Sequence, residues 1–167
     1  MTELDIDGMK FKFPLSWNAS KHDEWLYYRK HYSKTAYGVK AVDIIAVHRK
    51  TLWLIEVKDY RLHRRTKAIQ IHSEFALKVV FTLSSLLPAR INATRAVEQD
   101  AAKEALACDS IRLVLHIEQP ATHSKLFPRA IDPSKVHQKM KSALKAIDPH
   151  PLVVESSSMG SLQWLVS

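Results

Sequence analysis

The chain is poor in the residues that several common functional sites require. It has one cysteine, Cys108, among 167 residues. It therefore offers no internal disulfide framework and no zinc site built from thiolates. It also has only three glycines and lacks both the glycine-rich phosphate loop and the dinucleotide-binding fingerprint. These absences exclude disulfide scaffolds, thiolate zinc proteins and the common nucleotide-binding loops.

Long apolar runs are missing as well. No stretch is long enough and free enough of charge to cross a membrane. The first residues, Met-Thr-Glu-Leu-Asp, lack the basic and then apolar pattern of a secretory signal. We therefore expect no membrane association and a cytoplasmic location. A length of 167 residues favours a single domain that covers residues 1–167.

Basic residues are in excess. The chain has 25 Lys and Arg residues against 17 Asp and Glu residues, which gives a formal net charge of +8. Such a charge favours a polyanionic partner, because Lys and Arg side chains that neutralise phosphates release counterions. The alternative is that the charge only keeps the protein in solution.

The spacing of apolar residues predicts a mixed α/β domain with helices packed on a central sheet. Strands are expected over residues 10–14, 41–47, 52–58, 111–117, 152–155 and 162–166. Helices are expected over about residues 20–33, 72–87, 92–107 and 134–147.

Several residues suggest where these elements begin and end. Pro14 indicates that the first strand lies at a sheet edge. Ser20 is a candidate N-cap of the first helix, and Asp132 is one for the last. Pro88 is expected to end the second helix, which is apolar nearly all round, as in a helix packed inside a core.

Three charged residues stand in two apolar strands. Asp43 interrupts the run over residues 41–47, while Glu56 and Lys58 interrupt the run over residues 52–58. A short polar segment joins the runs, so we expect an antiparallel hairpin with its turn near Arg49 and Lys50. Alternation then puts Glu56 and Lys58 on one sheet face, with Asp43 within cross-strand reach. Burying such charges singly is costly, so they need a joint explanation.

These three residue types suit metal-dependent hydrolysis of a phosphodiester. Mg²⁺ or Mn²⁺ binds oxygen ligands and keeps several waters, so two carboxylates and a substrate phosphate suffice. A neighbouring lysine can position or deprotonate the attacking water, or stabilise the anionic transition state. The alternative is a metal-free ion pair of Lys58 with Glu56 or Asp43. Two carboxylates against one lysine leave an unpaired anion, which favours the metal site.

The motif Val42-Asp43, followed by Glu56-Val57-Lys58, resembles the PD-(D/E)xK nuclease superfamily, also called restriction-endonuclease-like. The resemblance covers about residues 21–117, and Val42 replaces the proline of the family name. It implies a restriction-endonuclease-like mixed sheet flanked by helices, with Mg²⁺ bound by Asp43 and Glu56 and water assisted by Lys58. Members often add an acidic residue from the first helix.

Glu24 is the candidate for this additional metal ligand, and Asp23 is the next. The alternative for both is a favourable position at the N-terminus of the expected first helix.

A basic segment after the hairpin is a candidate nucleic-acid contact. Arg61, Arg64, Arg65 and Lys67 follow the strand of Glu56, where a phosphate backbone has to pass. A solvated loop is the alternative. The sequence thus predicts a Mg²⁺-dependent nuclease, with DNA as the favoured substrate. We expect a homodimer or a protein partner that supplies specificity. The alternatives are a weak or inactive nucleic-acid-binding or assembly module of the same fold, and a metal-free structural domain.

Overall fold

The structure, a computed structural model, describes residues 1–126 and 128–167. Its strands are β1 (Thr2–Ile6), β2 (Met9–Phe13), β3 (Asn18–Lys21), β4 (Ile44–His48), β5 (Thr51–Asp59), β6 (Ser110–Glu118), β7 (Leu152–Val154) and β8 (Leu165–Val166). Its α-helices are α1 (Leu26–Lys30), α2 (Ile71–Asn92), α3 (Ala96–Leu106) and α4 (Pro133–Leu144), and the short 3-10 helices η1 (His22–Glu24) and η2 (Tyr32–Tyr37) flank α1. The expected mixed α/β class is confirmed.

A five-stranded sheet forms the centre of the fold, in the order β3-β4-β5-β6-β7. β4 is antiparallel to β3 and β5, whereas β5, β6 and β7 run parallel. The predicted hairpin is confirmed, with Ile44 opposite Ile55 and the turn at Arg49 and Lys50, whose φ angles are 47° and 62°. Two successive residues with positive φ give the tight turn that matches the twist of a hairpin. β5 is therefore the middle strand of the sheet.

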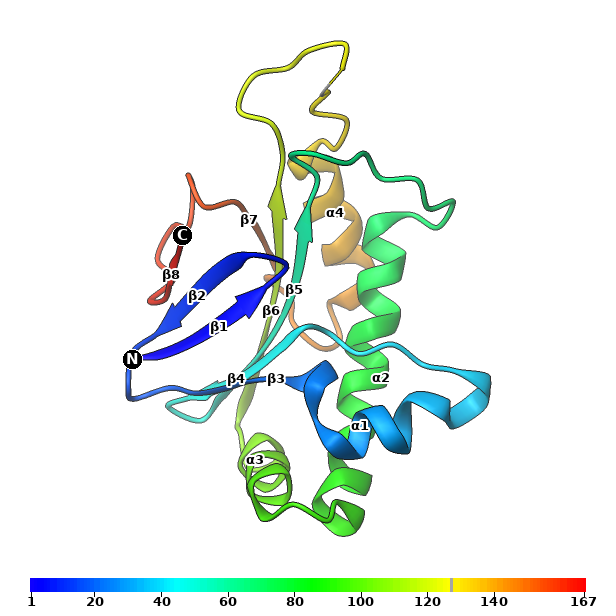
Figure 1. Cartoon of the computed structure of the whole chain (residues 1–167), viewed down its shortest axis with the longest axis vertical. Coiled ribbons are helices and arrows are strands. Elements are labelled where there is room, and N and C mark those ends of the chain that lie inside the picture. Colours follow the sequence, from blue (N-terminus) through cyan, green and yellow to red (C-terminus); the bar gives the residue numbers. More distant parts are fainter. Residues whose placement is uncertain (127) are drawn as a thin grey trace.

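The central sheet is covered on both faces, and its two covers differ (Figure 1). On one side Leu52 and Leu54 of β5 pack with residues of the helices. On the other side Ile55 and Val57 pack with residues of a second, three-stranded sheet. This explains why β5 is apolar on both faces, since successive side chains of a strand point to opposite faces.

The second sheet has the order β1-β2-β8. β2 lies between the other two strands, so the expectation that residues 10–14 form an edge strand is wrong. β1 and β2 are joined by a tight turn at Asp7 and Gly8, whose φ angles are 52° and 86°. Asp-Gly is a strong hairpin signal between alternating segments. This signal could have revealed β1 from the sequence.

The expected helix over residues 20–33 is also wrong in its first part. Ser20 belongs to β3 and pairs with Ile45 of β4 instead of capping a helix. Its hydroxyl accepts a hydrogen bond from Trp25 Nε1 at 3.0 Å. α1 starts after Trp25, and the Glu98 carboxylate of α3 accepts hydrogen bonds from its first two amides. The start of α1 is therefore set by the pairing of β3 with β4 and by the Glu98 carboxylate. Neither contact can be predicted from the residues next to the helix.

Pro88 lies inside α2 and does not end it, so that prediction is wrong. Proline removes one intrahelical hydrogen bond, which leaves the carbonyl four residues earlier, that of Ser84, without its usual donor. Ser84 is exposed, so this carbonyl lies on the side of the helix that water can reach. The helix therefore tolerates Pro88 and continues to Asn92.

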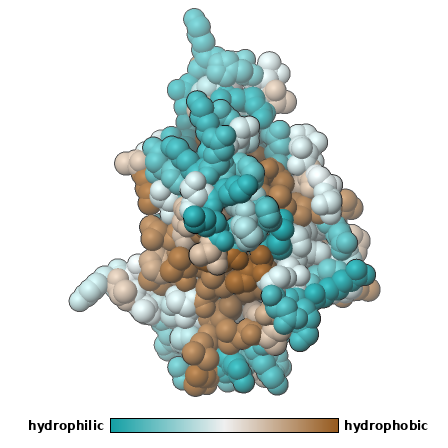
Figure 2. All heavy atoms as spheres, turned by 180° about the vertical axis from the view of Figure 1, so that it is seen from behind, coloured by the Kyte–Doolittle hydropathy of each residue, from teal (hydrophilic) through white to brown (hydrophobic). Residues whose placement is uncertain are grey.

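The buried face of α2 mixes apolar and polar residues, and the helix is not wholly buried. The buried side chains include the polar residues Glu74, Lys78, Thr82 and Ser85. The exposed side chains include the apolar residues Leu77, Val80, Leu87 and Ile91. Seen from behind, the molecule has a broad apolar area bounded by hydrophilic surface (Figure 2). The expectation of a core helix with apolar residues all round is therefore wrong, and its polar stripe faces the sheet.

The remaining elements agree with the sequence prediction within a few residues at their ends. Asp132 caps α4, because its Oδ1 accepts hydrogen bonds from the amides of Ser134 and Lys135 at 3.0 and 3.4 Å. Among the described residues, no helix combines the length and the apolar character that crossing a bilayer needs.

Candidate active site

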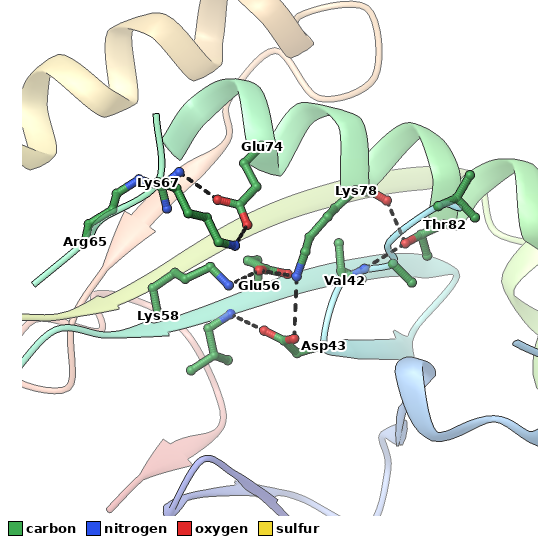
Figure 3. A network of polar contacts seen from close by, with 12 residues as sticks. Val42, Asp43, Glu56, Lys58, Arg65, Lys67, Glu74, Lys78 and Thr82 are labelled. Atoms are coloured by element: carbon green, nitrogen blue, oxygen red, sulfur yellow. Dashed lines mark hydrogen bonds and ion pairs between the residues drawn. The ribbon is translucent and has the colours of Figure 1, made fainter. Parts of the chain in front are cut away.

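Asp43 stands directly before β4 and faces the neighbouring strand. Its Oδ2 accepts a hydrogen bond from the amide of Val57 at 2.7 Å. Its backbone carbonyl accepts one from the amide of His22 at 3.0 Å. These bonds fix the carboxylate and leave Oδ1 directed toward α2 (Figure 3).

Glu56 and Lys58 lie on the face of β5 that is covered by α2 (Figure 3). The side chain of Glu56 is 1% exposed and that of Lys58 is 19% exposed. Lys58 Nζ pairs with Glu56 Oε1. The second oxygen, Glu56 Oε2, is buried and has no hydrogen-bond partner among the described residues. An unpaired buried oxygen is costly, so Oε2 is available to accept a proton, a hydrogen bond or a cation.

The carboxylates of Asp43 and Glu56 converge on a third residue, Lys78 of α2, which the sequence interpretation missed. Lys78 Nζ donates to Glu56 Oε1 at 2.5 Å and lies 3.8 Å from Asp43 Oδ1 (Figure 3). Two carboxylates therefore face two lysines, Lys58 and Lys78. The unpaired anion that favoured a metal over an ion pair does not exist, so that argument from the sequence is wrong.

The spacing of polar residues on α2 is the signal that could have revealed Lys78. Glu74, Lys78 and Thr82 recur every four residues, so they lie on one side of the helix. Thr82 Oγ1 donates to the carbonyl of Lys78 at 2.8 Å and accepts from the amide of Val42 at 3.0 Å. α2 is thereby tied to the segment that carries Asp43.

Burial and the nearby Asp43 carboxylate raise the pKa of Glu56, while Lys78 and Lys58 oppose the shift, and the net pKa is about 7. Burial alone lowers the pKa of Lys58, but Glu56, Asp43 and Glu74 together raise it above its usual value. Lys58 is therefore a firmly protonated cation near neutral pH. It can donate hydrogen bonds to a water or a phosphate but cannot serve as a base there.

Within the described residues, no three His, Cys, Asp or Glu side chains form a group that could hold a metal. A divalent cation at Asp43 and Glu56 would thus complete its shell with water and substrate oxygens, as Mg²⁺ commonly does. The chemistry of this donor pair and the unpaired Glu56 Oε2 fit such an ion.

The two candidate acids of the first helix take different positions. Glu24 is largely exposed and pairs with Lys21 at 2.7 Å. Asp23 is exposed as well, although its partial burial and the Asp43 carboxylate raise the pKa of Asp23. The structure therefore places Asp23, the second candidate, in the electrostatic range of Asp43.

The basic segment after β5 is partly neutralised by the protein itself. Arg65 pairs with Glu74 at 2.7 Å, and Lys67 pairs with the other oxygen of Glu74. Arg61 pairs with Asp59 at 2.7 Å. Arg64 donates only to backbone carbonyls in the bonds described, so its charge is not cancelled by a carboxylate.

An open groove of about 290 Å³ lies next to the candidate site. Lys78 forms part of its wall, together with Lys40, Lys67 and Glu74. Of these three lysines, Lys67 pairs with Glu74 and Lys78 pairs with the two carboxylates of the site. The apolar side chains of Leu77 and Phe81 also line the groove.

Comparison with known proteins finds a sequence match between this chain and part of a larger protein. It is 33% identical over 162 residues to a protein of Neisseria meningitidis serogroup A named cysteine–tRNA ligase. The match covers 79% of this chain but only 23% of that protein, so the chain spans about a quarter of its relative. No family model matches the chain. No solved structure matches it either.

Proposed function

We propose that this chain is a metal-dependent nuclease of the PD-(D/E)xK superfamily, which hydrolyses phosphodiester bonds of nucleic acid. The observation that supports this most is the convergence of Asp43 and Glu56 beside Lys58 on adjacent strands. Glu56 Oε2, buried without a partner among the described residues, adds an oxygen suited to a hard cation. The mixed five-stranded sheet, with this hairpin at its centre, is compatible with a restriction-endonuclease-like fold.

Each residue has a chemical role in this proposal. Asp43 Oδ1 and the Glu56 carboxylate would hold Mg²⁺ or Mn²⁺, which supplies charge neutralisation at the phosphate and lowers the pKa of a bound water. Lys58, protonated near neutral pH, donates to the attacking water or to the phosphate and orients it. Asp23 or Glu24 is proposed as an additional outer ligand, and the effect of the Asp43 carboxylate on the pKa of Asp23 supports Asp23.

Hydrolysis forms one bond from a water oxygen to phosphorus and breaks one ester bond. The leaving oxygen takes up a proton, and the water loses one.

The substrate is proposed to be nucleic acid, with DNA favoured. The groove beside the site carries Lys40, and the net charge of the chain is +8. Such charges favour a phosphate backbone. The relative from Neisseria is named for a tRNA substrate, so tRNA belongs among the substrates to be tested. A cytoplasmic location, a single domain and a homodimer or specificity-providing partner remain parts of the proposal.

A second function is favoured by Lys78. With this lysine the two carboxylates are balanced by two ammonium groups, so the cluster can persist without a metal. An inactive nucleic-acid-binding or assembly module of the same fold would keep such a cluster for stability. It would bind nucleic acid without cleaving it.

The decisive experiment is cleavage of plasmid DNA, single-stranded DNA and tRNA by the purified chain. Mn²⁺ or Mg²⁺ should support cleavage and EDTA should abolish it. Asp43→Ala and Lys58→Ala should each lower the rate by roughly a hundredfold or more. Lys12→Ala, a control on β2, should keep the wild-type rate. Equal rates in all four proteins would rule out this site, while binding without cleavage would select the inactive module.

A further inference from the structure

The ammonium group of Lys78 lies between the two carboxylates that the proposed function assigns to the metal. We propose that Lys78 is an internal cation that holds Asp43 and Glu56 together in the metal-free protein and is displaced when a divalent metal binds. This inference rests on the proposed function and describes how metal loading of the same site is regulated. It makes Lys78 a positioning residue, because it acts through the two carboxylates.

The first support is electrostatic. The side chains of Asp43 and Glu56 are 16% and 1% exposed, so water screens their mutual repulsion poorly. Two such carboxylates stay close when a cation lies between them or when one of them takes up a proton. Lys58 pairs with Glu56, but no ion pair joins it to Asp43 in the described part of the chain. Lys78 contacts both acids and is therefore the bridge.

The second support is that Lys78 and a metal would compete for Asp43 Oδ1 and for the space between the two carboxylates. Asp43 Oδ2 is already committed to the Val57 amide at 2.7 Å, which leaves Oδ1 for either cation. Lys78 Nζ lies 3.8 Å from this Oδ1 and 2.5 Å from Glu56 Oε1. A Mg²⁺ ion needs its oxygens at about 2.1 Å. An ammonium and a divalent ion cannot occupy this position together, because they exclude and repel one another.

The third support is a place for the displaced ammonium group. Lys78 also lines the open groove of about 290 Å³, which it shares with Glu74. Glu74 stands one helical turn before Lys78, so its carboxylate lies on the same side of α2. The Glu74 carboxylate already pairs with Arg65 and Lys67, so the displaced ammonium would share this carboxylate or be hydrated in the open groove. Either position needs only a change of side-chain rotamer.

Mn²⁺ binding measured by calorimetry and by electron paramagnetic resonance tests the inference without any nuclease assay. Wild type is compared with Lys78→Met and with the matched control Lys58→Met, which removes the same charge but touches Glu56 alone. Lys78→Met should bind Mn²⁺ at least about tenfold more tightly than wild type, because no ammonium has to be displaced. Lys58→Met should show a smaller gain.

Each other outcome has a separate meaning. If wild type binds Mn²⁺ and Lys78→Met binds it equally or more weakly, the inference about Lys78 is overturned and the metal site remains. If none of the proteins binds Mn²⁺, the proposed function itself fails. Should Lys78→Met not fold, Lys78→Gln replaces it, and melting is followed in EDTA and in Mn²⁺. Mn²⁺ must then raise the melting temperature of Lys78→Gln more than that of wild type, or the inference is wrong.

Discussion

Glu56 is the residue whose ionisation is most strongly tied to its surroundings. It is almost completely buried beside Asp43, and its pKa is about 7 instead of the ordinary 4.5. Between about pH 4.5 and pH 7, Glu56 therefore keeps its proton in the folded protein and loses it in the unfolded chain. Because the folded state binds more protons in this window, the free energy of unfolding falls as the pH rises through it.

This gives a prediction for Glu56→Gln, which cannot titrate. In EDTA, wild type should lose on the order of 1–3 kcal/mol of unfolding free energy between pH 5 and pH 7 through this group. Glu56→Gln should lose much less, as measured by urea unfolding at several pH values. Glu74→Gln is the control, because salt bridges hold the pKa of Glu74 at about 2, below the window. Equal pH slopes in wild type and Glu56→Gln would contradict the prediction.

The three charges of the hairpin could be predicted from the sequence because each interrupts an apolar strand. Lys78 could not be found in the same way. A lysine in a helix is ordinary, and the contact between Lys78 and Glu56 joins residues 22 positions apart. Only the packing of α2 on β5 shows that the lysine side chain is buried. Lys78 also changes the balance of charge between carboxylates and lysines on which the metal prediction depended.

At the level of elements, the segment after β5 is held against α2 by one acid. Glu74 binds both Arg65 and Lys67. If this segment contacts nucleic acid, Glu74 lowers its affinity by occupying two of its cations.

Glu74→Gln should therefore raise the affinity for DNA, by roughly threefold to tenfold at low salt. The matched control is Glu3→Gln on β1, which makes the same change of charge on the opposite side of the central sheet. Fluorescence anisotropy with labelled DNA measures both variants. An equal gain in the two would show that net charge alone matters and that the segment makes no special contact.

The elements that could be predicted are those whose signal is local. β4 and β5 are apolar runs joined by a short turn, so the sequence alone indicates both. β3 is short and only partly buried, and it is a strand because β4 lies beside it. α2 continues beyond Pro88 because the Ser84 carbonyl, which loses its hydrogen-bond donor, lies on the exposed side of the helix. The sequence therefore predicts secondary structure least well where a distant strand, as for β3, or contact with solvent, as at Pro88, decides the backbone conformation.

At the level of the whole molecule, the second sheet is a cover for one face of the central sheet. Trp164, just before β8, is 1% exposed and packs in a cluster with Phe13, Trp17 and Trp53. The end of the chain therefore contributes to a core that also includes β5.

Trp164→Ala should lower the free energy of unfolding by about 3–5 kcal/mol, because it leaves a cavity in this cluster. The neighbouring Leu165 is 63% exposed, so Leu165→Ala should cost less than about 1 kcal/mol. Urea unfolding compares the two. A similar cost for both would mean that the second sheet does not stabilise the fold.

The middle position of β5 has a consequence for partial opening of the molecule. Glu56 and Lys58 stand on a strand with a partner on each side, β4 and β6, and with a cover on each face. Fluctuations that detach β3, β7 or the second sheet leave both partners of β5 in place. Amide protons of β5 should therefore exchange only with global unfolding, and those of the outer strands much sooner. Glu56 and Lys58 thus lie in the part of the chain that opens last.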